Sequence, residues 1–396
     1  MRPWVSQRLT PRTNSWGIFG GMKFPGRGLL PLAAAGFLIF NGPQAGAQAA
    51  DAETARLIAD LGLKESATAL ADRPGWQAPL NIVVIGADAK RLAWMQPAAP
   101  GVKLIGASDR TEAVRKVADA DAVIGVCSAD IVNAGPRIRW IQHFSAGVER
   151  CLAIPGFASR GIVLTNMQKV AGPVMSEHVL ALMFGLSRGL ATYVPRQAAG
   201  DWAEDAVPEG RLLMLEGKTL FIAGLGGIGT EVARRANALG MKVIATRNTP
   251  HEKPPFVDEQ GMSKDLLAFA ARADVIVDAL PLTAETKGVF DKAVFGAVKH
   301  GALFINVGRG GTVVTADLIA ALQDGGVGGA GLDVTDPEPL PADHPLWHAP
   351  NVLITPHVAA ATDLGEEPRW LIARENLRRF AAGGKLLSEV SVDKGY

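Results

Sequence analysis

The chain has 396 residues, of which 48% are hydrophobic and 20% are charged, and its formal net charge at pH 7 is +1. At roughly 150 residues per domain, this length predicts two domains with separate hydrophobic cores. The balanced charge excludes the strongly basic footprint of a nucleic-acid-binding protein, and 45 glycines and 25 prolines are too few for a collagen-like or disordered chain.

Residues 1–47 have the features of a leader. They contain five basic side chains and no acidic one, whereas the rest of the chain is mildly acidic. The apolar run Leu29–Phe40 follows Lys23 and precedes Ala45-Gly46-Ala47, a small-x-small cleavage pattern. The run is too short to span a bilayer. We therefore expect a signal peptide over residues 1–47 and an exported, periplasmic mature chain with no membrane segment; a cytoplasmic protein is the alternative.

Strands and helices alternate after the leader. A helix is expected over residues 51–71, and buried strands are expected at 80–85, 102–106, 122–126, 139–144 and 162–165, with helices such as 111–118 between them. After a long helix expected over 174–193, a second series of strands is expected at 219–223, 242–245, 275–279, 302–307, 329–333 and 352–354. Such alternation predicts an α/β protein with two doubly wound parallel-sheet domains. The helical stretch 365–382 is expected to return to the first domain.

A glycine-rich segment, Gly224-Leu-Gly226-Gly227-Ile228-Gly229, directly follows the apolar strand 219–223 and opens a helix over 230–239. In such a loop the first glycine allows a tight turn, the second lets the backbone approach a pyrophosphate, and the third lets the helix lie close to the strand. The helix N-terminus adds free N–H groups and a partial positive charge. The strand–loop–helix–strand context therefore predicts a dinucleotide site.

The end of the second strand of this unit indicates which dinucleotide is bound. An NAD site usually carries Asp or Glu about 20 residues after the glycine loop, to bind the ribose 2′-hydroxyl. Here the strand ends Ala245-Thr246-Arg247-Asn248, so that Arg247 stands where the acid is expected. Because a guanidinium suits a 2′-phosphate, we expect NADP in preference to NAD. The alternative is that Arg247 is only a solvated loop charge.

Three titratable side chains follow successive strands of the second series. Arg309 comes after 302–307, Glu338 after 329–333 and His357 after 352–354. Parallel sheets bind their ligands in the loops at the carboxyl ends of their strands, so these three side chains are expected to lie together in a catalytic site.

Over roughly residues 80–390 the chain resembles the D-isomer-specific 2-hydroxyacid dehydrogenases. The matching segments are Ser145-Ala-Gly-Val-Glu149, Ser176-Glu-His-Val179, Gly224–Gly229, Leu280-Pro-Leu-Thr283 with Thr286, Asn306–Gly310, Leu332–Pro339 and Thr355-Pro-His357. Thr246-Arg247 and Pro345-Leu-Trp347 resemble the glyoxylate/hydroxypyruvate reductase branch. The resemblance implies a flavodoxin-like substrate domain over 48–173, a Rossmann NAD(P) domain over 174–360, and a C-terminal segment, 361–396, that returns to the substrate domain.

The resemblance also implies roles. His357 would be the general acid and base, Glu338 would orient its imidazole, and Arg309 would clamp the substrate carboxylate. The substrate-binding backbone would be that of Ala146, Gly147 and Val148. The implied cofactor residues, besides Gly224, Gly226, Gly227, Ile228, Gly229 and Arg247, are Asn248, Pro281, Thr283, Thr286, Val307 and Asp333, the last facing the nicotinamide amide.

The implied activity is hydride transfer between NADPH or NADH and a small 2-oxo or D-2-hydroxy acid, with glyoxylate/hydroxypyruvate-type reduction favoured. No metal and no nucleic-acid partner are expected. Homodimerisation through the region around 201–211 is implied.

One alternative is a non-catalytic NAD(P)-binding sensor or partner module, although intact Arg309, Glu338 and His357 argue against it. Another is a relative with different chemistry, such as formate or phosphite oxidation; formate oxidation is expected to pair the histidine with Gln rather than Glu.

Other side chains receive simpler expectations. The two cysteines, Cys127 and Cys151, form no CxxC motif, so a thiolate zinc site is not expected. We expect two free, partly buried thiols, with a disulfide in an oxidising compartment as the alternative. Glu177 and His178 are expected to serve helix packing, with an active-site role as the alternative.

Overall fold

The structure, a computed structural model, describes residues 43–208 and 210–395. Most of the predicted leader, residues 1–42, lies outside the described residues. The predicted cleavage site Ala45–Ala47 falls in the first turns of helix α1 (Pro43–Leu61). Within the described ranges, no helix has the length and apolar character needed to cross a membrane.

The first domain is built on a five-stranded parallel sheet in the order β2-β1-β3-β4-β5. Its strands are β1 (Asn81–Ile85), β2 (Lys103–Ala107), β3 (Ala122–Gly125), β4 (Trp140–His143) and β5 (Val163–Thr165). β-branched side chains such as Val83 and Ile141 are completely buried in the middle of the sheet. This strand order is that of flavodoxin-like folds, and the predicted fold class is confirmed for this domain.

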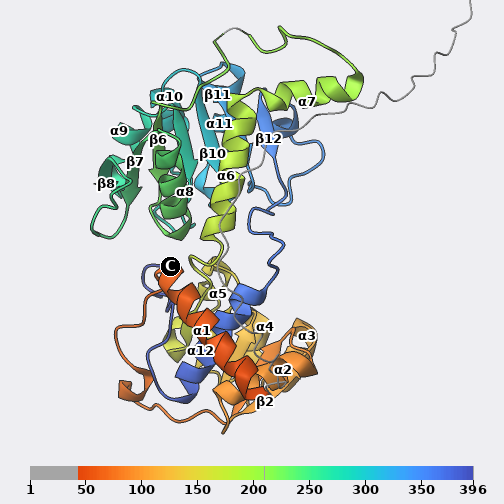
Figure 1. The fold of residues 1–396 in the computed structure, drawn as a ribbon, viewed down its shortest axis with the longest axis vertical. Helices are drawn as coiled ribbons and strands as arrows, with labels where there is room; N and C mark the ends of the chain where they lie inside the picture. The colour runs from red at the N-terminus through yellow and green to blue at the C-terminus, as the bar shows by residue number, and fades with distance from the viewer. Residues whose placement is uncertain (1–42, 209, 396) are drawn as a thin grey trace, which may run out of the picture. The chain divides into compact units, whose positions relative to one another are not determined.

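Helices cover this sheet from several parts of the chain. They are α1, α2 (Ala89–Met95), α3 (Arg110–Lys116), α4 (Ala129–Ala134), α5 (Glu149–Leu152) and α12 (Glu367–Ala381). The helices α1 and α12 come from opposite ends of the chain and pack against each other (Figure 1). The ring centroids of Trp140 in β4 and Phe380 in α12 lie 4.7 Å apart, and Arg374 forms an ion pair with Asp51 at 2.5 Å. The first core therefore needs the C-terminal helix.

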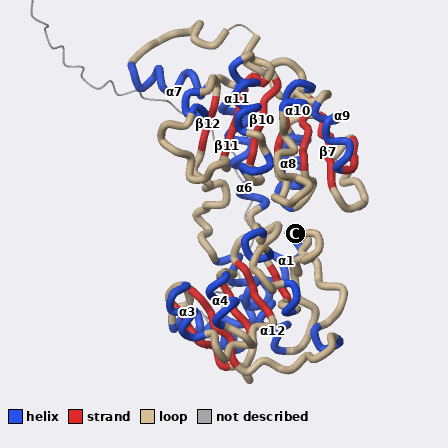
Figure 2. Tube along the Cα trace, turned by 180° about the vertical axis from the view of Figure 1, so that it is seen from behind, coloured by secondary structure: helices blue, strands red, loops and turns tan. Residues whose placement is uncertain are grey.

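The second domain is built on a seven-stranded parallel sheet in the order β12-β11-β10-β9-β6-β7-β8. Its strands are β6 (Thr219–Ala223), β7 (Lys242–Arg247), β8 (Glu259–Met262), β9 (Val275–Asp278), β10 (Ala302–Asn306), β11 (Val327–Leu332) and β12 (Val352–Ile354). Its helices are α6 (Gly172–Ser187), α7 (Leu190–Ala199), α8 (Gly227–Ala238), α9 (Leu266–Ala270), α10 (Lys292–Ala297) and α11 (Thr315–Gln323). Two apolar cores lie against the sheet, one with α6 and α8 and the other with α9, α10 and α11. The helices of this domain flank its strands (Figure 2). This doubly wound, Rossmann-type arrangement confirms the predicted class.

Some predicted elements differ from the structure. The long helix expected over 174–193 is broken, because Gly189 adopts a φ of +70° between α6 and α7. A Cβ at Gly189 would also stand 2.8 Å from Val207, so the site suits glycine alone. The helix expected over 51–71 ends at Leu61, followed by Gly62 with a φ of +55°. Strand β8 was not predicted, because its residues lie half-buried at a sheet edge and lack an apolar pattern.

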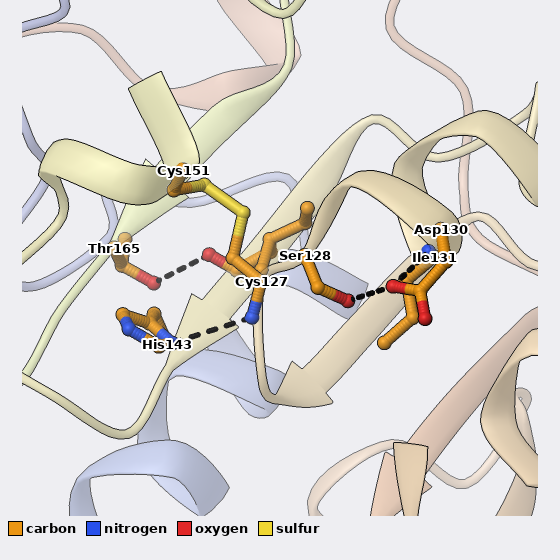
Figure 3. Close-up of a disulfide and its surroundings, with 8 residues drawn as sticks. Cys127, Ser128, Asp130, Ile131, His143, Cys151 and Thr165 are labelled. Atoms are coloured by element: carbon orange, nitrogen blue, oxygen red, sulfur yellow. Dashed lines mark hydrogen bonds between the residues drawn. A yellow bond between two sulfur atoms is a disulfide. The ribbon is translucent and has the colours of Figure 1, made fainter. Parts of the chain in front are cut away.

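A disulfide joins Cys127 to Cys151, so the prediction of two free thiols was wrong (Figure 3). Cys127 follows β3 and Cys151 lies in α5, which follows β4. Because β3 and β4 are neighbours in the sheet, the segments after them meet, and the two Cα atoms are 5.6 Å apart. The backbone N–H of Cys127 donates to Nδ1 of His143 at 3.3 Å. The bridge thus anchors the helix that directly follows the predicted substrate loop.

Loss of this bridge is expected to destabilise the first domain. The two cysteines are 24 residues apart, and closing a loop of this size stabilises a fold by about 3 kcal/mol through the unfolded chain. The double substitution Cys127→Ala with Cys151→Ala should therefore lower the free energy of unfolding by about 2–4 kcal/mol, measured by urea denaturation. Dithiothreitol should lower the urea concentration at the unfolding midpoint of the parent and should not change that of the double variant. Equal midpoints for oxidised parent and double variant would contradict the assignment.

Candidate active site

The loop after β10 holds Arg309 by its backbone carbonyl. This oxygen accepts hydrogen bonds from Nδ2 of Asn306 at 3.0 Å and from Oγ1 of Thr312 at 2.6 Å. The Thr312 hydroxyl also lies 2.5 Å from Oδ2 of Asp278, at the end of the neighbouring strand β9. Burial raises the pKa of Asp278 to about 7, although the hydrogen bonds from Thr312 and Leu280 act in the opposite direction. These hydrogen bonds therefore fix the backbone of Arg309 at the edge of the sheet.

His357 and Glu338 form a direct pair. His357 follows β12 and Glu338 follows β11, and Nδ1 of the imidazole lies 2.7 Å from Oε1 of the carboxylate. Their side chains are 49% and 41% exposed, so both reach solvent at the carboxyl end of the sheet. A carboxylate at this distance favours the proton on Nδ1 and leaves Nε2 to exchange a proton with a ligand. The pair has the arrangement of a general acid and base with its orienting partner.

Asp333 fastens the loop that carries the imidazole. Its carboxylate is buried and accepts hydrogen bonds from Oγ1 of Thr355 at 2.7 Å, from the Val358 N–H at 2.9 Å and from the Ala359 N–H at 3.0 Å. Nε2 of His178, in α6, lies 2.9 Å from the same Thr355 hydroxyl and 3.7 Å from Asp333. His178 was expected to serve helix packing, but here it belongs to the hydrogen-bond network that holds the His357 loop. The implied contact of Asp333 with a nicotinamide amide stays a prediction.

The predicted substrate loop of the first domain meets Arg309. A Cβ built on Gly147 would stand only 1.6 Å from a terminal nitrogen of Arg309, so the guanidinium lies directly on the glycine backbone. The neighbouring Ala146 carbonyl accepts a hydrogen bond from Asn166 at 2.7 Å, and Val148 is buried. The structure therefore brings the arginine and the substrate loop together.

Glu149 is a residue to which the sequence assigned no role. Its Oε1 lies 2.5 Å from Nε of Arg309, so the two side chains form a partly buried ion pair. Burial raises the pKa of Glu149, but the charge and hydrogen bond of Arg309 outweigh burial and hold that pKa below its usual value. The carboxylate therefore stays ionised. The only sequence signal for this contact was the position of Glu149 directly after the substrate loop.

The glycine loop after β6 has the geometry of a pyrophosphate cradle. Gly224 has a φ of +97°, and a Cβ there would stand 2.8 Å from the Ala279 carbonyl. A Cβ on Gly229 would stand 2.2 Å from the Gly224 carbonyl, so only glycine lets α8 begin this close to the strand. The helix starts at Gly227 with Gly226 as its N-cap, and no side chain caps it. Its first N–H groups therefore suit a phosphate, and the residues present fit a dinucleotide.

The remaining predicted cofactor residues lie in loops at the same edge of the sheet. Oγ1 of Thr286 donates to the Pro281 carbonyl at 2.6 Å and accepts from the Thr283 N–H at 2.8 Å. Asn248 follows β7, and its side-chain oxygen accepts from Ser263 at 3.0 Å. Val307 is buried directly after β10. Arg247 is the last residue of β7, beside the glycine loop, whose Gly224 and Leu225 N–H groups both donate to the Thr246 carbonyl.

Three further aromatic and imidazole side chains serve packing, lie at the surface or cap a helix. Trp140 is completely buried in the first core, and Trp202 is 90% exposed. Nδ1 of His344 accepts from the Leu346 N–H at 3.2 Å and so caps a short helix. Among the described residues, no group of three or more His, Cys, Asp or Glu side chains is placed to hold a metal ion.

Comparisons with known proteins agree with this geometry. Residues 180–359 match the family model described as D-isomer specific 2-hydroxyacid dehydrogenase, NAD binding domain. The glyoxylate/hydroxypyruvate reductase B of Citrobacter koseri is 33% identical over 253 residues, which are 62% of this chain and 76% of that protein. The glycerate dehydrogenase of Methylorubrum extorquens is 36% identical over 266 residues, which are 64% of this chain and 80% of that protein.

Solved structures are similar as well. A D-isomer specific 2-hydroxyacid dehydrogenase family protein from Aeromonas salmonicida has a TM-score of 0.67 and 31% identity, covering 80% of this chain and 100% of its own. An NADPH-dependent glyoxylate/hydroxypyruvate reductase from Sinorhizobium meliloti, in complex with NADP and sulfate, has a TM-score of 0.67 and 29% identity. The match covers 80% of this chain and 100% of that chain.

The close contact of Arg309 with Gly147 can be tested by adding one methyl group. Gly147→Ala should force the guanidinium out of place and lower the affinity for oxalate, a small carboxylate probe, about tenfold. Isothermal titration calorimetry measures the change. Gly296→Ala is the matched control, because a Cβ at Gly296 meets no atom within 4 Å. Equal oxalate affinity in the two variants would show that the guanidinium does not depend on this glycine.

Proposed function

The chain belongs to the D-isomer-specific 2-hydroxyacid dehydrogenases, and we propose that it reduces a short 2-oxo acid to the D-2-hydroxy acid with NADPH. The observation that carries the proposal is the convergence of two pairs at the carboxyl edge of the second sheet. One pair is Arg309 with the Gly147 backbone, and the other is His357 with Glu338 at 2.7 Å. A carboxylate clamp and a proton donor are the two protein groups that reduction of a 2-oxo acid requires.

Arg309 binds the substrate carboxylate in this proposal. Its guanidinium offers a planar fork of N–H donors, and its contact with Gly147 places that fork at the substrate loop. Glu149 already holds Nε at 2.5 Å, so the terminal N–H groups are the ones that face a substrate. One of them donates to the Gly308 carbonyl at 2.7 Å, which fixes the plane of the guanidinium. Glu149 is therefore a positioning residue that orients the clamp.

His357 supplies the proton. A bound nicotinamide cofactor supplies the hydride. As negative charge develops on the substrate oxygen, Nε2 of the imidazole donates its proton to that oxygen. Glu338 holds Nδ1 of the imidazole at 2.7 Å and so leaves Nε2 for this transfer. In the reverse direction, the same Nε2 accepts the hydroxyl proton of a D-2-hydroxy acid.

NADPH is the proposed cofactor, and glyoxylate and hydroxypyruvate are the proposed substrate type. Arg247 stands at the end of β7, where NAD enzymes place an acid for the ribose 2′-hydroxyl. The Sinorhizobium meliloti reductase, which is described as NADPH-dependent, supports both parts of the proposal, and the Citrobacter koseri reductase supports the substrate type.

We further propose that the protein is exported. The leader pattern supports this location, as does the disulfide, because disulfides persist in oxidising compartments. N-terminal sequencing of protein recovered from the periplasm should begin at Gln48, and an uncleaved cytoplasmic chain would refute the proposal.

A homodimer is proposed as well. Large apolar side chains are exposed around α7 and the segment after it, namely Val194, Trp202 and Met214. Exposed apolar surface of this kind is typical of subunit contacts. Sedimentation velocity should give the mass of two chains, and a strict monomer at micromolar concentration would refute the proposal.

The catalytic assignment is tested by His357→Ala. The substitution should reduce kcat for NADPH-dependent reduction of glyoxylate and hydroxypyruvate by about 10²- to 10⁴-fold, because the proton donor is lost. Fluorescence titration should still detect NADPH binding. His348→Ala, which changes an exposed histidine nearby in the sequence, is the control. Turnover in the His357 variant equal to that of the control would refute the assignment.

Cofactor preference is tested by Arg247→Asp. A carboxylate repels a 2′-phosphate and suits a 2′-hydroxyl, so the ratio of kcat/KM for NADPH to that for NADH should fall by about 10- to 100-fold. Steady-state kinetics with both cofactors provides the ratio. Lys242→Ala, at the other end of β7, should leave the ratio unchanged. An unaltered ratio in the Arg247 variant would remove this residue from cofactor selection.

A further inference from the structure

Four basic side chains from separate segments gather beside the glycine loop. Nζ of Lys64, which follows α1, lies 3.1 Å from Nε2 of His251, which follows β7. Lys169, in the loop after β5, lies against the start of α8, since a Cβ on Gly227 would stand 2.8 Å from its Cα. Arg247 acts electrostatically on both Lys169 and His251. We call Lys64, Lys169, Arg247 and His251 the basic cluster.

The backbone at Lys169 is unusual. Its φ is +71°, in the left-handed region that favours glycine. Backbone strain of this kind is concentrated at functional sites. Nζ of Lys169 donates to the Gly62 carbonyl, which holds the lysine across the segment after α1. An ammonium has three donors, so two remain for a ligand.

The charges within the basic cluster repel one another. Burial lowers the pKa of Lys169, and the positive charges of Lys64 and Arg247 lower it further. The pKa of His251 is lowered mainly by Arg247 and then by Lys64. Two acidic side chains of adjoining segments have other partners: Glu65 pairs with Arg379 at 2.6 Å, and Glu231 pairs with Arg234 at 2.8 Å. An anion of high charge would relieve this repulsion.

The position of the basic cluster indicates which anion it binds. It surrounds the end of β7, beside the N-terminus of α8, and its members come from both domains. We propose that Lys64, Lys169 and His251 complete, with Arg247, a binding site for the 2′-phosphate of NADP(H), so that the substrate domain as well as the cofactor domain holds the cofactor. The inference rests on the NADP assignment in the proposed function. It also offers an exported enzyme a way to retain a cofactor that the surroundings do not replenish.

Binding of four probes to the full chain tests the site. Affinities are measured by calorimetry for NADPH, NADH, adenosine 2′-monophosphate and adenosine 5′-monophosphate. Lys64→Ala and Lys169→Gly should each weaken binding of NADPH and of the 2′-monophosphate about tenfold, while binding of NADH and of the 5′-monophosphate changes by less than about twofold. Added salt should weaken NADPH binding more in the parent than in the variant that combines Lys64→Ala with Lys169→Gly.

The variants are chosen so that misfolding does not obscure the result. Glycine suits the φ of +71° at position 169, so Lys169→Gly removes the side chain and relieves the backbone. Lys64 is exposed, and Lys64→Gln is a second variant that keeps its hydrogen-bonding capacity while removing its charge. Lys242→Ala, an exposed lysine at the far end of β7, is the matched control and should bind all four probes as the parent does.

Two outcomes would overturn the proposal. Unchanged affinity for the 2′-monophosphate in a folded Lys64/Lys169 double variant would remove these lysines from the site. Equal weakening of NADPH and NADH would place the basic cluster at the pyrophosphate, which both cofactors share. Because the probes need no turnover, a chain that reduces no 2-oxo acid but still discriminates the two monophosphates would refute the proposed reaction and leave this binding site standing.

Discussion

The contact between Arg309 and the substrate loop is the interaction on which the site depends. The guanidinium belongs to the cofactor domain, yet it lies on the backbone of Gly147 and pairs with Glu149 at 2.5 Å, and both residues belong to the first domain. An ion pair of this kind is specific in geometry even where its net contribution to stability is small. Its position links the proposed carboxylate clamp, Arg309, to the predicted substrate loop, residues 146–148. Neither domain holds the clamp without the other.

Two buried acidic residues hold the loops that carry Arg309 and His357. Asp278 fastens the Arg309 loop through Thr312, and Asp333 fastens the His357 loop through Thr355 and two backbone N–H groups. The reacting side chains can therefore stay accessible while their backbones are held by networks inside the protein. Preorganisation of this kind lets donors stabilise developing charge without first rearranging.

The sequence was most informative where local pattern and function coincide. Apolar strands, the glycine loop and the three post-strand residues Arg309, Glu338 and His357 all follow from short segments, because parallel strands must end at a common edge. The contact of Glu149 with Arg309, the Cys127–Cys151 bridge and the basic cluster join segments far apart in the chain, and only the folded topology brings them together. The break at Gly189 was missed because an apolar helical pattern continues across a single glycine, whose φ decides the outcome.

The shared packing of α1 and α12 has a consequence for how the protein is made. The first core joins Leu57 and Leu61 to Trp140 and to Trp370, Leu377 and Phe380, so the first domain is not contiguous in the chain. Domains usually fold as units while synthesis proceeds, but this one lacks part of its interior until its last helix has left the ribosome. The N-terminal half therefore stays without a completed core until α12 has been synthesised.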